Sequence, residues 1–342
     1  MITEHAVVDG ETYQDISEFD ADADRWSSSK SGLWGKCPTA GYYGHTLNLT
    51  SEEESPPLYS GKALHVGLET YYVSGDRDLA LAQMAESFGE RDQLPPGHKY
   101  SHLNLGHLEV VFQNYMDWAD RRDHFEVIAA SLEDLSLEGE GWRVCGARFK
   151  VYEETGEILF GESKVVFGVE PDPAWGMQGD DKLFKITVIP DMPIDLGGGF
   201  YVLDHKSTNG YLSDWYFSQY KLSNQLRIYC WSVQKLIEAM DIRVNGALIN
   251  GLYMGDRASL SEFKGTRFAR FGPMLFQPAH LTESLINHYY WSKTKEYYDS
   301  IKYYPQNAGR SCQGCSYAPL CTAAPKMRKG IISQQYKVEE RH

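Results

Sequence analysis

The residues with the clearest chemical potential lie in one short segment. Asp191 follows an apolar run, Phe184–Ile189, and a three-glycine turn then leads to a second run that delivers Asp204 and Lys206. Strand, glycine turn and strand predict a β-hairpin. Because residues two apart on a strand share a face, Asp204 and Lys206 point the same way. Two carboxylates and an ammonium suit a divalent metal ion and a phosphodiester, although a surface hairpin with an ordinary ion pair would show the same residues.

Hydrolysis of a phosphodiester needs an activated water and a stabilised leaving oxygen, and one or two Mg²⁺ ions can supply both. Mg²⁺ uses few carboxylates and keeps several waters. We therefore expect Asp191 and Asp204 to bind Mg²⁺ or Mn²⁺, with the backbone carbonyl of His205 as a third ligand. Lys206 would orient the attacking water or help deprotonate it, and would offset negative charge in the transition state.

A long helix predicted over residues 212–240 carries Gln225 and Tyr229. These residues lie one helical turn apart and share a face. An amide and a phenol suit contacts with a phosphate or nucleotide beside a metal site. A half-buried helix face with ordinary polar residues is the alternative interpretation.

The order of these residues resembles that of a known family. Pro190-Asp191 is followed by Asp204-His205-Lys206 and then by Gln225-Leu-Arg-Ile-Tyr229. This series resembles the PD-(D/E)XK nuclease superfamily, and within it the RecB-like branch. The resemblance implies a restriction-endonuclease-like core and catalytic roles for Gln225 and Tyr229. It also implies a metal-dependent DNA exonuclease that prefers single-stranded ends.

The RecB-like branch typically carries an upstream histidine in a helix. The segment Gly61–Glu69 resembles that element, which implies that His65 is a metal ligand. The resemblance extends from about Ser27 to Cys321 and is weakest between about residues 74 and 169.

The cysteines are distributed unevenly. Four of them, enough for tetrahedral Zn²⁺ or a [4Fe–4S] cluster, flank the predicted core, and these are Cys37, Cys312, Cys315 and Cys321. Their spacing leaves both metals open. The arrangement resembles iron–sulfur members of the RecB-like branch, of the AddB and Cas-four types, which implies a [4Fe–4S] cluster that clasps the two ends of the chain. Cys145 and Cys230 fit no such pattern and are predicted to be buried thiols.

A basic and aromatic stretch near residue 260 is a candidate DNA contact. Its cations alternate with phenylalanines, a combination that suits phosphate charge and base stacking in single-stranded DNA. The candidates are Arg257, Lys264, Arg267 and Arg270. A hairpin with its phenylalanines in the core is an equally good interpretation. Lys326, Arg328 and Lys329 are further candidates for phosphate contacts.

The whole chain has 342 residues, 42% of them hydrophobic, and a net charge of −14. This charge argues against a generally basic surface that coats nucleic acid, but not against a nuclease with an acidic metal site. With no apolar run of membrane-spanning length and no basic-apolar leader, we expect a soluble intracellular protein of the cytoplasm, of cellular or viral origin.

Hydrophobic periodicity predicts an α/β protein with a mixed sheet covered by helices on both faces. The expected parts are an acidic, partly ordered segment at 1–30, a helical section at 31–125, a nuclease core at 126–280 and a C-terminal helix with the cysteine cluster at 281–342. The expected elements are helices at 58–72, 79–88, 105–119 and 281–303, and strands at 125–130, 142–152, 158–169, 246–254 and 268–276.

The chain has no P-loop motif, so we expect it to act alone or with a separate helicase or recombination protein. The alternative function is a catalytically inactive subunit that binds DNA ends in a recombination or CRISPR-adaptation complex.

Overall fold

The computed structural model describes residues 2–8, 11–16, 25–52, 54–91, 94–95, 97–152, 155–175, 177, 183–255 and 266–338, the first two ranges by their backbone alone. The helices in these ranges are α1 (Ser28–Lys36), α2 (Pro38–Gly41), α3 (Pro56–Ser74), α4 (Arg77–Phe88), α5 (Leu105–Ala119), α6 (Asp214–Ser218), α7 (Asn224–Leu236), α8 (Pro278–Ile301), α9 (Ala318–Thr322) and α10 (Pro325–Gln335). The strands are β1 (Ile2–Val8), β2 (Glu11–Ile16), β3 (Leu49–Ser51), β4 (Glu126–Val127), β5 (Glu138–Gly139), β6 (Trp142–Val151), β7 (Ile158–Val169), β8 (Phe184–Val188), β9 (Met192–Asp195), β10 (Phe200–Thr208), β11 (Val244–Tyr253), β12 (Phe268–Leu275) and β13 (Tyr336–Val338).

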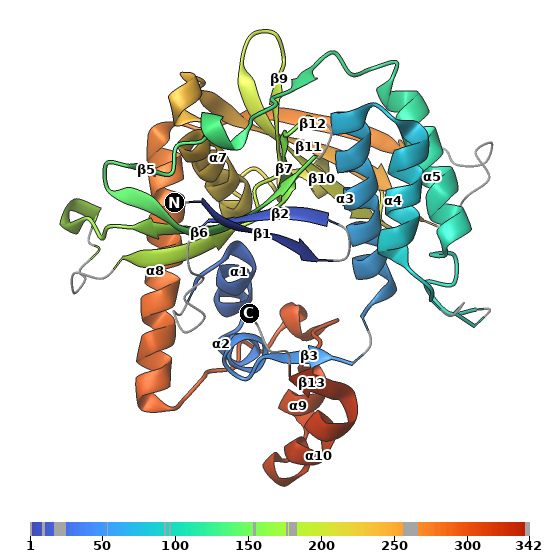
Figure 1. Cartoon of the computed structure of the whole chain (residues 1–342). Coiled ribbons are helices and arrows are strands. Elements are labelled where there is room, and N and C mark those ends of the chain that lie inside the picture. The colour runs from blue at the N-terminus through green and yellow to red at the C-terminus, as the bar shows by residue number, and fades with distance from the viewer. Residues whose placement is uncertain are drawn as a thin grey trace.

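Within the described chain the strands form three sheets (Figure 1). An antiparallel sheet of six strands has the order β1-β2-β6-β7-β8, with β5 paired to β6. A mixed sheet of five strands has the order β12-β11-β10-β9-β4, in which β10 and β11 run parallel and the other neighbours run antiparallel. The short strands β3 and β13 pair with each other. The expected mixed sheet is therefore present.

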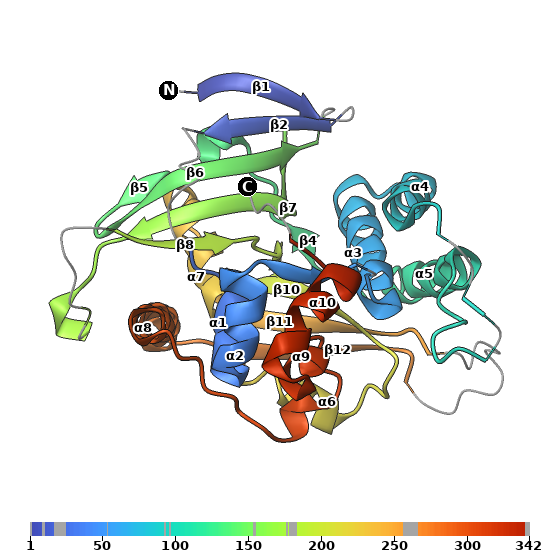
Figure 2. The ribbon, with the colours of Figure 1, turned by 90° about the horizontal axis from the view of Figure 1, so that it is seen from below.

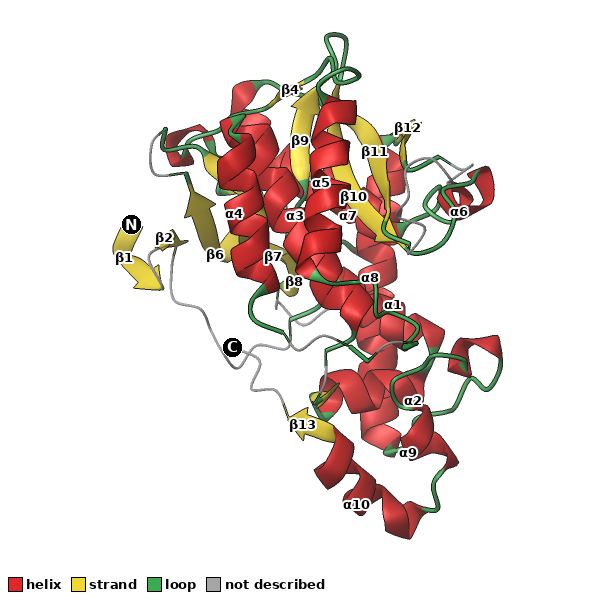
Figure 3. Cartoon of the chain, turned by 90° about the vertical axis from the view of Figure 1, so that its right-hand side faces the viewer, coloured by secondary structure: helices red, strands yellow, loops and turns green. Residues whose placement is uncertain are grey.

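Helices cover both faces of the five-stranded sheet. Helices α3, α4 and α5 form one group (Figures 2 and 3), and their apolar side chains share a buried cluster with Leu252 and Phe268. Helix α7 lies against the other face, where Leu226 and Ile228 pack with Val202 of β10. Because side chains alternate along a strand, β10 presents one set of residues to α7 and the other set to α3–α5. This alternation positions the candidate site.

The six-stranded and five-stranded sheets share one hydrophobic core. Ile186 of β8, Val202 of β10 and Val233 of α7 belong to the same cluster of buried residues. Trp26 enters this core and its backbone bridges Ile186. The two sheets are therefore docked through α7 rather than separated into independent units.

Two segments far apart in the sequence meet away from the two large sheets, in a unit that we name the terminal clasp. It consists of residues 37–51 together with residues 312–338, at the bottom of Figure 1. Its centre is the β3–β13 pair, and the Tyr317 hydroxyl donates to the Leu49 carbonyl at 2.8 Å. The segments that carry the clustered cysteines therefore lie together, as predicted, whereas the N-terminal strand β1 lies in the six-stranded sheet.

Within the segment expected at 1–30, residues 2–8 and 11–16 form β1 and β2, and β2 pairs with β6. One expectation about the elements is corrected. The single helix expected at 212–240 is broken into α6 and α7, because Ser213 and Ser223 each accept a hydrogen bond from a backbone N–H and start a new helix. None of the described helices combines the length and apolar character needed to cross a membrane.

Candidate active site

Strand β10 carries the centre of the site. Asp204 and Lys206 point to the α7 side of the sheet, as their spacing predicts. Asp204 is 1% exposed, and the Lys206 Nζ donates a hydrogen bond to its Oδ1 at 2.7 Å. Burial opposes the charge on Lys206, but Asp204 and Asp191 outweigh it, so the pKa of Lys206 is raised above its ordinary value. Lys206 therefore remains a cation and a hydrogen-bond donor.

Asp191 reaches the site from a different place than the sequence indicates. The expected hairpin began at Phe184, but β8 belongs to the six-stranded sheet and the hairpin partner of β10 is β9. Asp191 lies where the chain crosses from one sheet to the other. The strand prediction for Phe184–Ile189 was correct, whereas its pairing was wrong, because a run of apolar residues does not specify which strand it joins.

The two carboxyl groups form a buried pair. Asp191 is buried and lies within hydrogen-bonding range of Asp204. Its pKa is raised well above its ordinary value, first by burial and then by the negative charge of Asp204, while Lys206 opposes the rise. The pair therefore binds a proton, or a cation in its place, more readily than an exposed carboxylate does.

Helix α7 brings Gln225 and Tyr229 to the same place. The Lys206 Nζ donates to the Gln225 Oε1 at 3.4 Å, and the Gln225 Nε2 donates to the Tyr229 hydroxyl at 2.7 Å. The pKa of Tyr229 is raised well above its ordinary value by burial and by the charges of Asp191 and Asp204. The structure thus brings together the five residues that the sequence analysis predicted to be catalytic, with Tyr229 as a neutral phenol.

Helix α3 closes the site from the other side with His65. The His65 ring lies against His205, with ring centroids 5.9 Å apart, so two residues predicted to bind the metal are neighbours. The pKa of His65 is lowered by burial and then by Lys206, while Asp204 opposes the fall. His65 is therefore a neutral imidazole, which is the form that binds metals.

The donor set fits a hard divalent cation. The Asp204 Oδ2 is buried and receives no hydrogen bond from any donor among the described residues, and Asp191 faces the same carboxyl group. Two carboxylates with a nearby carbonyl oxygen are the ligands that Mg²⁺ and Mn²⁺ prefer. The residues that the structure describes do not, however, hold three or more His, Cys, Asp or Glu side chains in the arrangement of a formed metal site.

Three residues near the site were missed by the sequence analysis. Glu69 is buried one helical turn after His65 and accepts a hydrogen bond from the Gly161 N–H at 2.7 Å. Its four-residue spacing from His65 would have indicated it. Tyr216 and Tyr220 of the α6 region also lie near the site, because Tyr216 interacts electrostatically with Lys206. The four-residue spacing of Tyr216 and Tyr220 did not mark them as site residues, because the break between α6 and α7 was not predicted.

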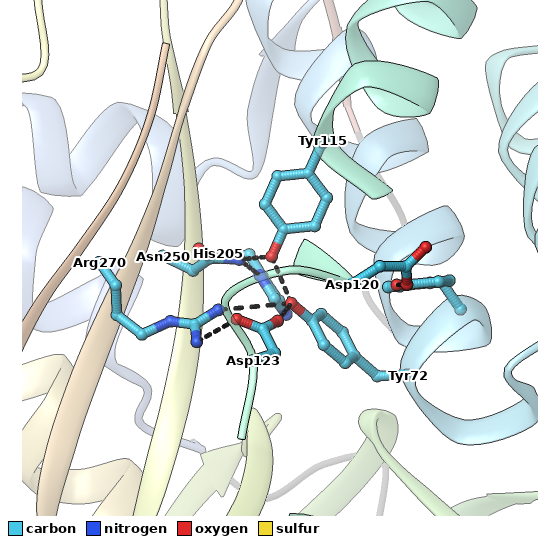
Figure 4. Close-up of polar contacts among 8 residues, drawn as sticks. Tyr72, Tyr115, Asp120, Asp123, His205, Asn250 and Arg270 are labelled. Atoms are coloured by element: carbon cyan, nitrogen blue, oxygen red, sulfur yellow. Dashed lines mark hydrogen bonds and ion pairs between the residues drawn. The ribbon is translucent and has the colours of Figure 1, made fainter. Parts of the chain in front are cut away.

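A buried polar network lies on the opposite side of β10 (Figure 4). The Asn250 amide contacts the His205 Nδ1 at 2.9 Å and donates to the Tyr115 hydroxyl, which is hydrogen bonded to Tyr72. Tyr72 in turn donates to the Asp123 Oδ2 at 2.6 Å. The side chain of His205 is therefore fixed on the α3–α5 side, while its backbone carbonyl lies beside His65.

Arg270 completes this network, which corrects its assignment as a DNA contact. Its Nη1 donates to the Asp123 Oδ1 at 2.5 Å, and its Nη2 contacts the Tyr72 hydroxyl at 3.4 Å. Both charged side chains are largely buried. A guanidinium committed to a buried carboxylate binds the protein itself rather than a phosphate.

The other predicted DNA contacts have different positions. Arg257 and Lys264 lie outside the described residues. Arg267 is partly exposed just before β12. Lys326 and Lys329 are exposed on α10, whereas Arg328 of the same helix donates a hydrogen bond to the Ala323 carbonyl at 3.3 Å.

The four clustered cysteines gather in the terminal clasp. The pKa of Cys321 is raised by burial and then by its neighbours Cys37, Cys315 and Cys312, so the four thiols are close enough to interact. Asn307 lies among them, because its N–H donates to the Cys37 Sγ at 3.5 Å and its carbonyl faces Cys312. The described thiols are not already arranged as a metal-binding group. Cys230 is buried and Cys145 is half-buried.

Comparison with known proteins agrees with this geometry. The family model described as the PD-(D/E)XK nuclease superfamily matches residues 25–322. A search of curated proteins found no significant match. Members of this superfamily are generally nucleases that hydrolyse phosphodiester bonds and typically use Mg²⁺ or Mn²⁺. The matched range contains the buried carboxylate pair, Lys206 and the α7 residues, and the chain belongs to the PD-(D/E)XK nuclease superfamily.

Proposed function

We propose that this protein is a metal-dependent DNA exonuclease that degrades single-stranded ends. The observation that carries the proposal is the contact of Lys206 with Asp204, whose carboxyl group also faces Asp191 in a buried site. The preference for an exonuclease of the RecB-like branch rests on His65, Gln225 and Tyr229, which resemble the motifs of that branch and surround the same strand. Such an enzyme would act on ends opened by a separate helicase or recombination protein.

Each residue of the site has a chemical role in this proposal. Asp191, Asp204, the His205 carbonyl and His65 would hold the divalent ion. A bound divalent ion supplies Lewis-acid stabilisation of the negative charge on the phosphodiester. Lys206 would donate hydrogen bonds to the attacking water or to the phosphate, or help to deprotonate that water. Gln225 holds Lys206 in place and is itself held by Tyr229.

Digestion of labelled DNA with Mg²⁺ or Mn²⁺ tests the proposal. Linear single-stranded DNA should be degraded from its ends, linear duplex more slowly, and closed circular single strands should survive. The Asp204→Asn variant should bind DNA but not cleave it. Cleavage of circles would show an endonuclease, and DNA binding by the wild type without cleavage under either metal would establish the alternative, a non-catalytic subunit that binds ends.

We also propose that Cys37, Cys312, Cys315 and Cys321 hold a structural [4Fe–4S] cluster. The four thiols fit such a group because they gather at the β3–β13 pair, where a cluster would tie the two ends of the chain together. Anaerobically purified protein should be coloured and contain about four iron atoms per chain. Cys315→Ser should lose the iron and lower the Tm, whereas Cys145→Ser should retain it. A colourless protein with stoichiometric zinc would overturn the cluster in favour of zinc.

A further inference from the structure

The segment that joins β10 to α7 forms one side of the candidate active site. Phe217 of α6 packs over Gly251 of β11, which is the sheet partner of Lys206. The adjacent Tyr216 lies within the electrostatic influence of Lys206. Tyr216 and Tyr220 pack edge to face, with ring centroids 5.6 Å apart and hydroxyl groups 3.2 Å apart. One side of this segment therefore faces the reacting centre.

A second side of the segment is fixed to the five-stranded sheet. Phe217 is buried and stacks on Phe271 of β12, with ring centroids 5.1 Å apart and an angle of 7° between the planes. Phe217 and Leu212 lie over Gly251 of β11, where a Cβ atom would come within 2.9 Å of both side chains. The Ser213 hydroxyl caps the start of α6. The segment is thus a fixed part of the sheet surface and not a loose loop.

The third side of the segment exposes large apolar groups to solvent. Trp215 is 84% exposed, the highest exposure among the large hydrophobic side chains that the structure describes, and Leu222 is 78% exposed. Tyr211 is also exposed and stacks on Tyr253, with ring centroids 6.2 Å apart and an angle of 8°. Lys221 lies exposed beside them. Single exposed apolar residues are ordinary, but three within twelve positions (211 to 222) beside the candidate active site form an apolar patch typical of a binding surface.

We propose that this patch, residues 211–222, is a binding subsite for the unpaired bases of the DNA substrate, with Trp215 as the base-stacking platform. The inference rests on the proposed nuclease function and names the part of the substrate that the site recognises. A flat indole in solvent offers the surface on which a base stacks, and Lys221 offers a cation for the adjacent phosphate. In a duplex the faces of interior bases are covered by their neighbours, so the patch favours single-stranded DNA.

Fluorescence anisotropy in EDTA tests the subsite without requiring cleavage. The probes are a labelled oligothymidylate, the same backbone with abasic sites, and a blunt duplex. Trp215→Ala should weaken binding of the oligothymidylate by roughly 5- to 150-fold, the range that stacking of one base supports, and should leave the abasic probe unchanged. Trp215→Phe should retain most of the affinity. Tyr297→Ala is the matched control, because Tyr297 is an exposed aromatic residue on α8.

The outcomes separate the subsite from the nuclease function. Equal binding of the oligothymidylate by wild type and Trp215→Ala would overturn the subsite and leave the nuclease proposal intact. Equal loss for the thymidylate and abasic probes would also overturn it, because stacking would then not be the cause. If the wild type neither binds any of the probes nor cleaves DNA with metal, the nuclease proposal and the subsite are overturned together.

Discussion

The imidazole of His65 lies against His205, the residue between Asp204 and Lys206. This contact joins helix α3 directly to strand β10. The two histidine rings pack edge to face, with centroids 5.9 Å apart. The helical section is therefore part of the candidate active site and not only a covering layer.

Replacing His65 should weaken metal binding more than catalysis. We expect His65→Ala to raise the Mn²⁺ concentration for half-maximal cleavage by roughly 10- to 100-fold, as for other residues that hold or orient a metal. Activity at saturating Mn²⁺ should recover in large part. A metal titration of cleavage measures both quantities, with His98→Ala, at an exposed position, as the control. A lower Tm with an unchanged titration would show that His65 has a structural role only.

Replacing the two aspartates near the hairpin should affect the cleavage rate differently. Asp191→Asn should lower the cleavage rate by at least about 100-fold, because Asp191 belongs to the buried pair with Asp204. Asp195→Asn should remain close to wild type, because Asp195 accepts a hydrogen bond from the Gly197 N–H at 2.7 Å and asparagine can still accept it. End-labelled DNA at saturating Mg²⁺ provides the measurement. Loss of activity in Asp195→Asn with retention in Asp191→Asn would exchange the roles.

Glu69 should make the stability of the fold depend on pH. Burial, followed by the charge of Glu162, raises the pKa of Glu69 from 4.5 to about 8. A raised pKa means that the folded state holds the proton more tightly, so this contribution to stability is complete below pH 4.5 and is lost as the pH rises through 8. Glu69→Gln, which keeps the acceptor for Gly161, should be more stable than wild type at pH 9 by on the order of 3 kcal/mol.

Urea denaturation between pH 5 and pH 9 measures this difference. The gap between Glu69→Gln and wild type should widen with pH, while Glu86→Gln, at an exposed position on α4, should follow the wild type. A constant gap would show that Glu69 does not titrate in this range.

Arg270 should matter for stability and not for DNA affinity. Arg270→Ala leaves Asp123 buried without its cation, which typically costs about 3–5 kcal/mol. The double variant Arg270→Met with Asp123→Leu should recover part of this loss, because no unpaired charge remains. Denaturation curves measure the stability of each variant. Oligonucleotide binding measures its DNA affinity, which should not change. Weaker DNA binding by Arg270→Ala with unchanged stability would restore Arg270 as a DNA contact.

The sequence predicted those parts of the site that depend on local periodicity. Asp204 and Lys206 share a face because strands repeat every two residues, and Gln225 and Tyr229 meet because helices repeat every 3.6. These rules act between neighbours, so the predicted contacts of Lys206 and Tyr229 are present in the structure.

The parts that depend on distant contacts could not be predicted. Phe184–Val188 has the composition of a strand, but its partner is β7 and not the following strand. Arg270 stands beside phenylalanines in a pattern typical of DNA contacts, whereas its carboxylate partner Asp123 lies 147 positions earlier. Pairing of this kind is decided by the packing of whole elements, which propensity and charge patterns do not record.

The position of Asp191 between the two sheets has a consequence during protein synthesis. The chain leaves the ribosome with β8 before β10, and β10 needs β11 as its parallel neighbour. Asp191, however, immediately precedes β9, whose Met192 pairs with Leu203 of β10, so the antiparallel register of this one hairpin already sets Asp191 opposite Asp204. The carboxylate pair therefore forms with a local hairpin as soon as β10 is made, whereas its burial waits for α7, which follows in the chain and packs against β10.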